Sequence, residues 1–417
     1  MHIYFSGIGG VGLGPLAEIA YDAGYQVVGS DLNEGLMTEK LRSYGIEVHV
    51  GQDGSFLRAT HDADPVDWFI YTAALQPSHA ELTLARQLGI RVAKRDELLA
   101  YIIREKKLKI IAVSGTHGKT TATAMFVWAM QQLTIPVSYS IGTTISFGPS
   151  GHFDPASQYF VYECDEFDRN FLHFSPYLSI VTSLDHDHAD TYPTTADYLN
   201  AFSQFASQSR QVIAWNDQHP EVYDGLSQVT LLNPSQINQS VAVTGIHNRR
   251  NATLVQTALR SLGYDQATDD ILASFPGTDR RFEKLADNLY TDYGHHPVEI
   301  AATLQLAREI SDHVVLVYQP HQNIRQHEIR DDYANKFESA DQIYWLPTYL
   351  SRENPDLAIL QPAELIQNIA NKDHIQVVGL DDELWGLIQT ARRDGKLVLG
   401  MGAGTIDGWL RQHAANS

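Results

Sequence analysis

The stretch VSGTHGKTTATAM at residues 113–125 combines a Gly-rich turn with a lysine and two threonines. The candidate loop consists of Gly115, Thr116, His117, Gly118, Lys119, Thr120 and Thr121. A Walker A loop has four residues between its first glycine and Gly-Lys-Ser/Thr, whereas this chain has only Thr116 and His117 there. An apolar run before the loop and a helical pattern after it would still direct backbone N–H groups at an anion. The pattern predicts a shortened triphosphate loop, with Lys119 facing the terminal phosphates and Thr120 facing Mg²⁺; the alternative is a chance GKT at a helix start.

A second Gly-rich turn follows the first apolar run of the chain, and an acid ends the next apolar run. The turn contains Gly7, Gly9, Gly10 and Gly12, and the acid is Asp31. Taken alone, this is the dinucleotide fingerprint, with the acid on a ribose hydroxyl. An NAD-dependent oxidoreductase is therefore a rival hypothesis. The motif itself requires only that a diphosphate or similar anion can come close, and a turn that serves packing alone is a further alternative.

Two acidic clusters follow buried strand-like runs. YECDEFD supplies Glu163, Asp165, Glu166 and Asp168, and SLDHDHADTY supplies Asp185, His186, Asp187, His188 and Asp190. Beside a phosphate, Mg²⁺ uses few protein ligands and keeps several waters. We therefore expect a magnesium site opposite the phosphate loop; zinc is the alternative, and any single acid could equally be a solvated or capping residue.

Four later polar stretches lie at predicted strand–helix junctions: GIHNRRNA (245–252), TDRRFE (278–283), TDYGHHP (291–297) and YQPHQNIR (318–325). Such junctions meet at the carboxyl edge of parallel sheets, where ligands bind. Each signal is weak on its own, because Arg-Arg pairs are usually surface residues and His-His-Pro often starts a helix.

The elements that must position these residues form an α/β series, with apolar strand-like runs alternating with helical patterns. We expect strands at 2–7, 25–31, 66–73, 90–94, 109–114, 158–164, 177–183, 210–215, 289–294, 313–319, 342–347, 375–380 and 396–402, and helices to about residue 22, over 96–105, over 119–132 and after 244. The economical interpretation is three α/β domains, at residues 1–108, 109–276 and 277–417.

Composition restricts the function classes. The chain has 417 residues and a formal net charge of −20, which argues against broad nucleic-acid or membrane-surface binding. Its single cysteine, Cys164, precludes an intramolecular disulfide and suits a reducing compartment. Because we find neither a membrane-spanning run nor a signal peptide, a cytoplasmic location is the expectation.

Taken in order, these stretches resemble the Mur ligase family. The resemblance covers nearly the whole chain and depends on GIGGVG, SGTHGKTTATAM, ECDEFD, DHDHADTY, GIHNRRNA, GTDRRF, DYGHHPVE, YQPHQNIR and GAGTID. It implies an N-terminal Rossmann-like domain for a UDP-sugar, a central P-loop mononucleotide-binding α/β domain for ATP, and a C-terminal Rossmann-like domain for an amino acid. The implied activity is ATP- and Mg²⁺-dependent amide formation in peptidoglycan precursor synthesis, on the branch that joins L-alanine to UDP-N-acetylmuramate.

The resemblance also implies residue roles. The diphosphate of the UDP-sugar would lie at Gly7–Gly12 with Asp31. Mg²⁺ would be held by Thr120, Glu163 and His188, ATP by the 115–121 loop together with Asn248, Asn251, Arg281 and Asp292, and the amino acid by Tyr293, His295, His321 and Arg325. Lys119, His188 and Arg281 would be the catalytic residues. Spreading ligands over several domains implies that domain closure accompanies the reaction.

The chain departs from the family pattern at three places. Gln322 replaces an Arg near the amino-acid carboxylate, Phe167 replaces a Ser, and the segment between Asn216 and Gly245 is short. These departures leave the sister ligase that recycles a preformed tripeptide as the near alternative. A non-catalytic nucleotide-binding regulator is a further one, and the chain could be a monomer or a homodimer.

Overall fold

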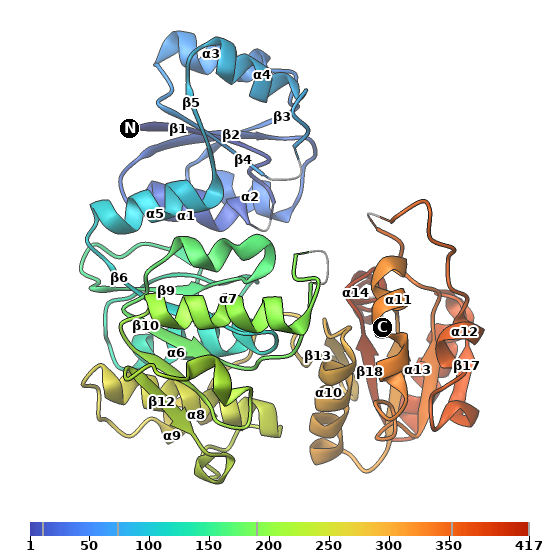
Figure 1. The fold of residues 1–417 in the computed structure, drawn as a ribbon. Helices are drawn as coiled ribbons and strands as arrows, with labels where there is room; N and C mark the ends of the chain where they lie inside the picture. The colour runs from blue at the N-terminus through green and yellow to red at the C-terminus, as the bar shows by residue number, and fades with distance from the viewer. Residues whose placement is uncertain (11, 73–74, 189–190, 352, 416–417) are drawn as a thin grey trace. The chain divides into compact units, whose positions relative to one another are not determined.

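The structure, a computed structural model, describes residues 1–10, 12–72, 75–188, 191–351 and 353–415. The chain forms two compact units: Met1–Val241 with Asn251–Phe275, and Ala242–Arg250 with Pro276–Ser417. Three sheets lie within these units (Figure 1), two in the first and one in the second. Each sheet falls inside one of the three predicted segments, whose bounds stay predictions.

The first sheet is parallel and has the strand order β3-β2-β1-β4-β5. Its strands are β1 (His2–Ser6), β2 (Gln26–Asp31), β3 (Glu47–Val50), β4 (Trp68–Tyr71) and β5 (Arg91–Lys94). Its helices are α1 (Leu13–Asp22), α2 (Leu36–Ser43), α3 (Ser55–Ala63), α4 (Ala80–Gln87) and α5 (Arg95–Glu105). Along β1, Ile3 and Phe5 join one core and Tyr4 joins the other. Both faces of the sheet are thus covered, as strand alternation requires.

The central sheet has the order β12-β11-β10-β6-β9-β7-β8, with only β7 and β8 antiparallel among the pairs described. Its strands are β6 (Lys109–Ser114), β7 (Ser138–Ser140), β8 (Gly151–His152), β9 (Tyr159–Glu163), β10 (Leu178–Val181), β11 (Val212–Trp215) and β12 (Val229–Leu232). Its helices are α6 (Lys119–Gln132), α7 (Thr195–Gln208), α8 (Ile246–Ser261) and α9 (Asp269–Ala273), with 3₁₀ turns at Phe167–His173, Pro220–Tyr223 and Pro234–Gln236.

One hydrophobic core is shared by the first and central sheets. It includes Leu16 of α1, Ile102 of α5, Ile110 of β6 and Phe205 of α7. Polar contacts reinforce this junction: the buried Glu18 carboxylate accepts a hydrogen bond from Gly151 N, and Asp22 pairs with His152 at 2.8 Å. The Gly turn of the first sheet and the phosphate loop of the central sheet therefore belong to one unit.

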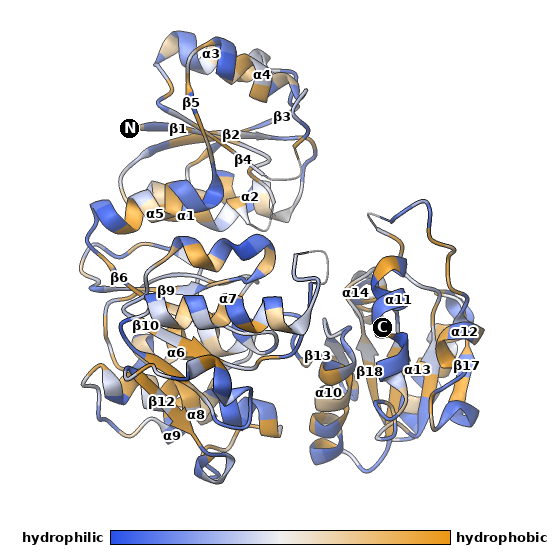
Figure 2. Ribbon diagram, viewed as in Figure 1, coloured by the Kyte–Doolittle hydropathy of each residue, from blue (hydrophilic) through white to orange (hydrophobic). Residues whose placement is uncertain are grey.

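The third sheet has the order β13-β14-β18-β15-β16-β17, parallel except for the β13–β14 pair among the ladders described. Its strands are β13 (Glu283–Ala286), β14 (Leu289–Asp292), β15 (Val314–Tyr318), β16 (Gln342–Trp345), β17 (Ile375–Val377) and β18 (Leu397–Met401). Its helices are α10 (Pro297–Ile310), α11 (Asn323–Ile329), α12 (Pro362–Ile366), α13 (Asp382–Arg393) and α14 (Ile406–Ala415), with 3₁₀ turns at Arg330–Tyr333 and Lys372–His374. The central strands are apolar along their length (Figure 2), which is typical of parallel strands buried on both faces.

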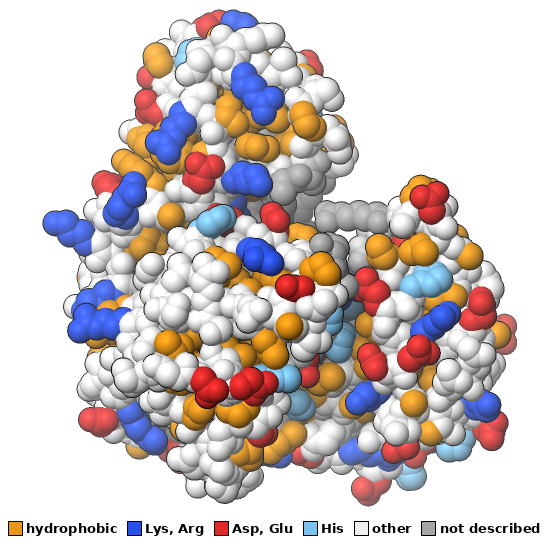
Figure 3. Space-filling model, viewed as in Figure 1, with side chains coloured by type: hydrophobic (Ala, Val, Ile, Leu, Met, Phe, Trp, Pro, Cys, Tyr) orange, Lys and Arg blue, Asp and Glu red, His pale blue; other side chains and the backbone are white. Residues whose placement is uncertain are grey.

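The surface matches the acidic composition only in part. On the face drawn in Figure 3, acidic and basic side chains are interspersed. None of the helices in the described part of the chain has the length and apolar character that a bilayer crossing requires.

Candidate active site

The phosphate loop connects β6 to α6, and its two glycines allow close contacts with neighbouring residues. Gly115 has φ +124°, and a Cβ there would lie 2.5 Å from Thr182 Oγ1 and 2.7 Å from the Ser183 carbonyl oxygen. Gly118 has φ +84°, and its Cβ would lie 3.0 Å from Asn251 Oδ1. Only glycine adopts such backbone without strain. The shortened loop thus retains the strand–turn–helix geometry predicted from its sequence.

Residues that follow β10 hold the loop through hydrogen bonds. The Thr116 hydroxyl donates to the Asp185 carbonyl at 2.8 Å and lies 2.7 Å from the Tyr198 hydroxyl. His117 N donates to Ser183 Oγ at 2.9 Å, and Thr182 Oγ1 donates to the His117 carbonyl at 2.6 Å. The loop is therefore held at both middle residues before any ligand binds.

Lys119, the first residue of α6, folds back over its own loop. Its Nζ donates to the Gly115 carbonyl at 2.7 Å and to the two Glu166 carboxylate oxygens at 2.9 and 3.0 Å. Burial pulls the pKa of Lys119 down, but Glu166 and Asp165 more than offset it and raise that pKa above its ordinary value. Lys119 is charged, and its ammonium group lies between the Gly115 carbonyl and the Glu166 carboxylate.

The acidic residues form two neighbouring groups at the end of β9. Thr120 Oγ1 donates to Glu163 Oε1 at 2.7 Å, while Glu163 Oε2 accepts from Gly142 N at 2.7 Å. Ligand atoms of Asp165, Glu166 and His188 lie within 4.8 Å of one another. Burial raises the pKa of Glu166 to about 7, against the opposing effect of Lys119.

The predicted magnesium ligands Thr120, Glu163 and His188 do not all lie in one group. Thr120 and Glu163 are hydrogen-bonded to each other, whereas His188 lies 3.8 Å from Glu166 and is grouped with Asp165 and Glu166 instead of Glu163. The pairing of Glu166 with Lys119 was not predicted, because it depends on the path of the chain after β9. Thr121 is half-buried on α6, and Asp190 lies outside the described residues.

The N-terminal Gly turn connects β1 to α1. Gly7 has φ +83°, and Gly10 N donates to the Gly7 carbonyl at 3.1 Å. Asp31, at the end of β2, accepts a hydrogen bond from Gly9 N at 2.8 Å. The structure thus brings the predicted glycines and Asp31 together at the carboxyl edge of the first sheet, and one Asp31 oxygen is already used by the turn.

In the C-terminal unit, Asp292 and Arg281 are neighbours. Asp292 is buried at the end of β14, where its carboxylate accepts from Phe282 N at 2.8 Å and Gly294 N at 2.7 Å. Burial raises the pKa of Asp292 to about 6, and the Arg281 charge opposes that rise. Arg281 lies 5.5 Å above the Tyr293 ring and 3.7 Å from Glu299.

The predicted amino-acid residues cluster at the ends of β14 and β15. Arg325 Nη1 lies 2.6 Å from His295 Nε2, and the His295 ring is 5.5 Å from that of His321 and 5.8 Å from that of Tyr293. Burial lowers the pKa of His295 to about 4, so that its ring is neutral at pH 7. Gln322, which replaces the family Arg, has φ +56° and immediately precedes α11.

The two asparagines predicted to bind ATP, Asn248 and Asn251, lie one turn apart on α8. Asn251 is buried and lies beside Gly118. The Asn248 amide donates to the Thr244 carbonyl at 2.9 Å, and this part of α8 belongs to the C-terminal unit. Residues three apart on a helix share a face, and the role of both asparagines in ATP binding stays a prediction.

Sequence reasoning missed Arg95, the first residue of α5. Its guanidinium lies against Gly12 in a pocket that also contains Glu163 and Asp165. The signal that could have found it is its position immediately after β5, at the same sheet edge as the Gly turn.

Three domain families match successive parts of the chain. They are described as "Mur ligase family, catalytic domain" over residues 2–107, "Mur ligase middle domain" over 113–233, and "Mur ligase, glutamate ligase domain" over 280–404.

Individual proteins are similar over almost the full length. A UDP-N-acetylmuramate–L-alanine ligase of Dinoroseobacter shibae is 31% identical, with 98% of this chain and 95% of the relative covered. The crystal structure of a UDP-N-acetylmuramate–alanine ligase of Thermotoga maritima superposes with a TM-score of 0.78 at 26% identity, covering 100% of this chain and 99% of that one. A murein peptide ligase of Psychrobacter arcticus, 22% identical with 99% and 98% covered, shares the fold with a TM-score of 0.65.

Proposed function

The chain belongs to the Mur ligase family, and from this we propose that it joins L-alanine to the lactyl carboxyl group of UDP-N-acetylmuramate at the expense of ATP. The single observation that carries the proposal is Lys119, charged and held over the glycine loop beside the carboxylates after β9. A charged lysine at a helix N-terminus is the arrangement that binds a transferable phosphoryl group.

The chemistry requires that a carboxylate be activated, because it is a poor electrophile. The acid oxygen attacks the γ-phosphorus of ATP, the bond to ADP breaks, and an acyl phosphate forms. The amine nitrogen then attacks the acyl carbon, the amine proton leaves to solvent, and inorganic phosphate departs as the C–O bond breaks. Lys119 and Arg281 would offset the charge that develops on the transferred group.

The residues around the loop suit Mg²⁺. A hydroxyl and carboxylates, from Thr120, Glu163, Asp165 and Glu166, are the hard oxygen donors that this ion prefers, and His188 adds a nitrogen. When bound, the ion would neutralise phosphate charge during transfer. Glu166 would help to hold the ion, and Lys119, which it binds in this structure, would then be available to the nucleotide.

The second substrate would bind in the C-terminal unit. Arg325 and His321 would bind the carboxylate of the amino acid; the neutral His295, whose ring is 5.5 Å from that of His321, accepts a hydrogen bond from Arg325. The missing positive charge at Gln322 is the reason to test the amino acid directly.

The decisive experiment measures phosphate release with ATP, Mg²⁺ and UDP-N-acetylmuramate while amino acids and the muramyl tripeptide are added one at a time. We expect L-alanine to stimulate release and Lys119→Ala to reduce kcat by roughly 100- to 1,000-fold, since it removes a charge that acts in the transition state. Lys106→Ala, outside the loop on the turn after α5, is the control and should retain full activity.

Stimulation by the tripeptide but not by L-alanine would replace this proposal with the recycling ligase. A nicotinamide-dependent absorbance change without ATP would favour the oxidoreductase, and a Lys119→Ala variant that loses only nucleotide affinity would favour a regulator.

A further inference from the structure

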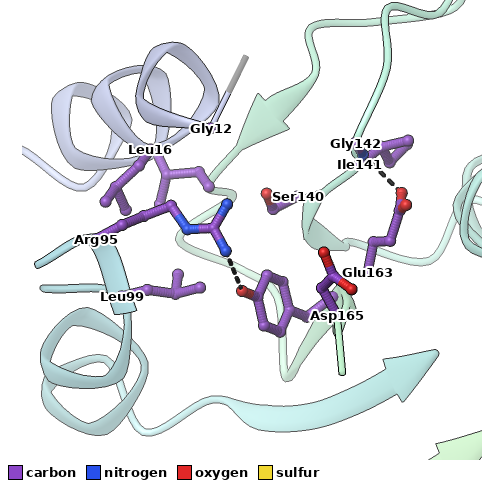
Figure 4. A pocket seen from close by; sticks show the side chains of 11 residues that line it. Gly12, Leu16, Arg95, Leu99, Ser140, Ile141, Gly142, Glu163 and Asp165 are labelled. Carbon is purple, nitrogen blue, oxygen red and sulfur yellow. Dashed lines mark hydrogen bonds between the residues drawn. The ribbon is translucent and has the colours of Figure 1, made fainter. Parts of the chain in front are cut away.

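A pocket in the first unit extends from the N-terminal Gly turn to the acids after β9 (Figure 4). Its walls come from α1, α5 and the ends of β7 and β9. The lining residues are Gly12, Leu16, Ile19, Arg95, Leu99, Ser140, Ile141, Gly142, Tyr162, Glu163 and Asp165. Among them Arg95 is the one basic residue, and it faces two acids.

Arg95 is fixed from several directions. It is the first residue of α5 and follows β5 directly. Its Nε donates to Asp96 Oδ1 at 3.1 Å, and its Nη2 lies 3.5 Å from the Tyr162 hydroxyl. Figure 4 shows the Arg95 guanidinium directed into the pocket, towards the side where Glu163 and Asp165 lie. Asp96 lies in the first turn of α5, where a negative charge is favourable, so the guanidinium is oriented before any ligand binds.

The guanidinium lies close to the backbone of Gly12. Gly12 has φ −93°, which any residue can adopt. A Cβ at this position would nevertheless lie 3.0 Å from Arg95 Nη1. The positive charge of Arg95 therefore lies close to the backbone at the start of α1.

Electrostatics limits what can enter this pocket. Glu163 and Asp165 on the far wall would repel an anion, and the chain as a whole carries a net charge of −20. The Gly turn has no cationic side chain of its own, and Gly9 N and Gly10 N already donate to Asp31 and to the Gly7 carbonyl within the fold. A planar guanidinium donates two parallel hydrogen bonds to phosphate oxygens and supplies the missing charge.

We infer that Arg95 binds the diphosphate of the sugar nucleotide at the Gly12 end of the pocket. The inference depends on the proposed function for the identity of the ligand. We assign the diphosphate rather than the lactyl carboxylate to Arg95, because Nη1 lies against Gly12 of the Gly turn, whereas the carboxylate has to meet the γ-phosphate at the phosphate loop.

The test uses two sugar nucleotides in calorimetric titrations. UDP-N-acetylglucosamine carries the diphosphate without the lactyl carboxylate, whereas UDP-N-acetylmuramate carries both. We expect Arg95→Met to weaken both by about 10- to 100-fold, the size typical of a charged hydrogen bond. Arg95→Lys, which keeps the charge but not the fork, should lie between, and it preserves packing if the Met variant does not fold.

Arg104→Met is the matched control, since Arg104 is exposed on the same helix; it should bind both ligands within about twofold of the wild type. In turnover, Arg95→Lys should raise the KM for the sugar nucleotide and leave the KM for ATP and kcat near their wild-type values. A loss confined to UDP-N-acetylmuramate would transfer Arg95 to the carboxylate and overturn the inference, as would unchanged binding of both. If the wild-type protein binds neither sugar nucleotide, the proposed function fails as well.

Discussion

At the scale of single residues, the active-site charges are paired before substrates arrive. Lys119 is hydrogen-bonded to Glu166, and Arg325 to His295. Buried charges are costly unless such partners satisfy them. The Lys119–Glu166 pair must therefore open when a phosphate takes the place of the carboxylate, whereas Arg325 keeps further N–H donors for a carboxylate while it is bound to the neutral His295.

His295 provides a pH-dependent test of this arrangement. Burial lowers the pKa of His295 from 6.5 to about 4. Between these pH values the ring is protonated in the unfolded chain but neutral in the folded chain. Stability should therefore fall as the pH drops from about 6.5 towards 4, with a cost of roughly 2–4 kcal/mol from this residue alone when the pH reaches the folded pKa and below.

The measurement is an NMR titration of histidine-labelled protein. The signal absent from His295→Gln should titrate with a midpoint near 4 in the folded wild type. The variant should also lose part of the acid-dependent destabilisation in urea unfolding. A midpoint near the ordinary histidine value would show that the ring is solvated and that its bond to Arg325 does not persist.

Some residue contacts could be anticipated from sequence and others could not. Lys119 and Thr120 follow from a local motif, in which the spacing fixes the geometry. The Lys119–Glu166 hydrogen bond joins residues 47 positions apart. In the turn that follows Glu166, Asp168 and Arg169 adopt left-handed backbone. Sequence periodicity does not predict such a turn, and Arg95 belongs to none of the motifs identified in the sequence.

At the scale of elements, the shortened phosphate loop depends on Gly115. Alanine there would meet Thr182 Oγ1 at 2.5 Å and backbone atoms of Ser183 at 2.7 and 2.9 Å. Backbone cannot move aside as a flexible side chain can, and the positive φ adds strain of about 1–3 kcal/mol. We expect Gly115→Ala to lower the melting temperature and to abolish ATP-dependent phosphate release.

Gly263→Ala separates backbone strain from the clash. Gly263 has φ +89° with no atom within 4 Å of its Cβ position, so this variant should lose only about 1 kcal/mol and keep full activity. Equal melting temperatures and full activity for both variants would mean that the loop relaxes freely around a methyl group.

The elements that sequence predicted best are those buried on both faces. The runs at 109–114 and 313–319 became β6 and β15, and the predicted helix at 119–132 became α6 with the same bounds. The short strands β7 and β8 were not predicted, because runs of three and two residues are too short to show an alternation of polar and apolar side chains. Their pairing is fixed instead by α1, against which Gly151 packs so closely that a Cβ would meet the Pro15 carbonyl.

At the scale of the whole molecule, the candidate ligands are divided between the two units. Lys119, Thr120 and Asn251 belong to one unit, and Asn248, Arg281 and Asp292 to the other. The boundary falls inside α8, after Arg250. The start of this helix is held in the C-terminal unit by Arg249, which pairs with Glu309 at 2.8 Å. The helix α8 therefore has residues in both units.

This division predicts closure on binding. If Arg281 and Asp292 contact ATP held by Lys119 and Thr120, the two units must come together when a non-hydrolysable ATP analogue and UDP-N-acetylmuramate are both present. Small-angle scattering should then record a smaller radius of gyration for the wild type. Arg281→Met should not contract, whereas Lys284→Met should contract like the wild type, since Lys284 is exposed and pairs only with Asp287 among the contacts described. An unchanged radius in the wild type at saturating ligand would mean that ATP is bound by one unit alone, and that Arg281 acts elsewhere than on its phosphates.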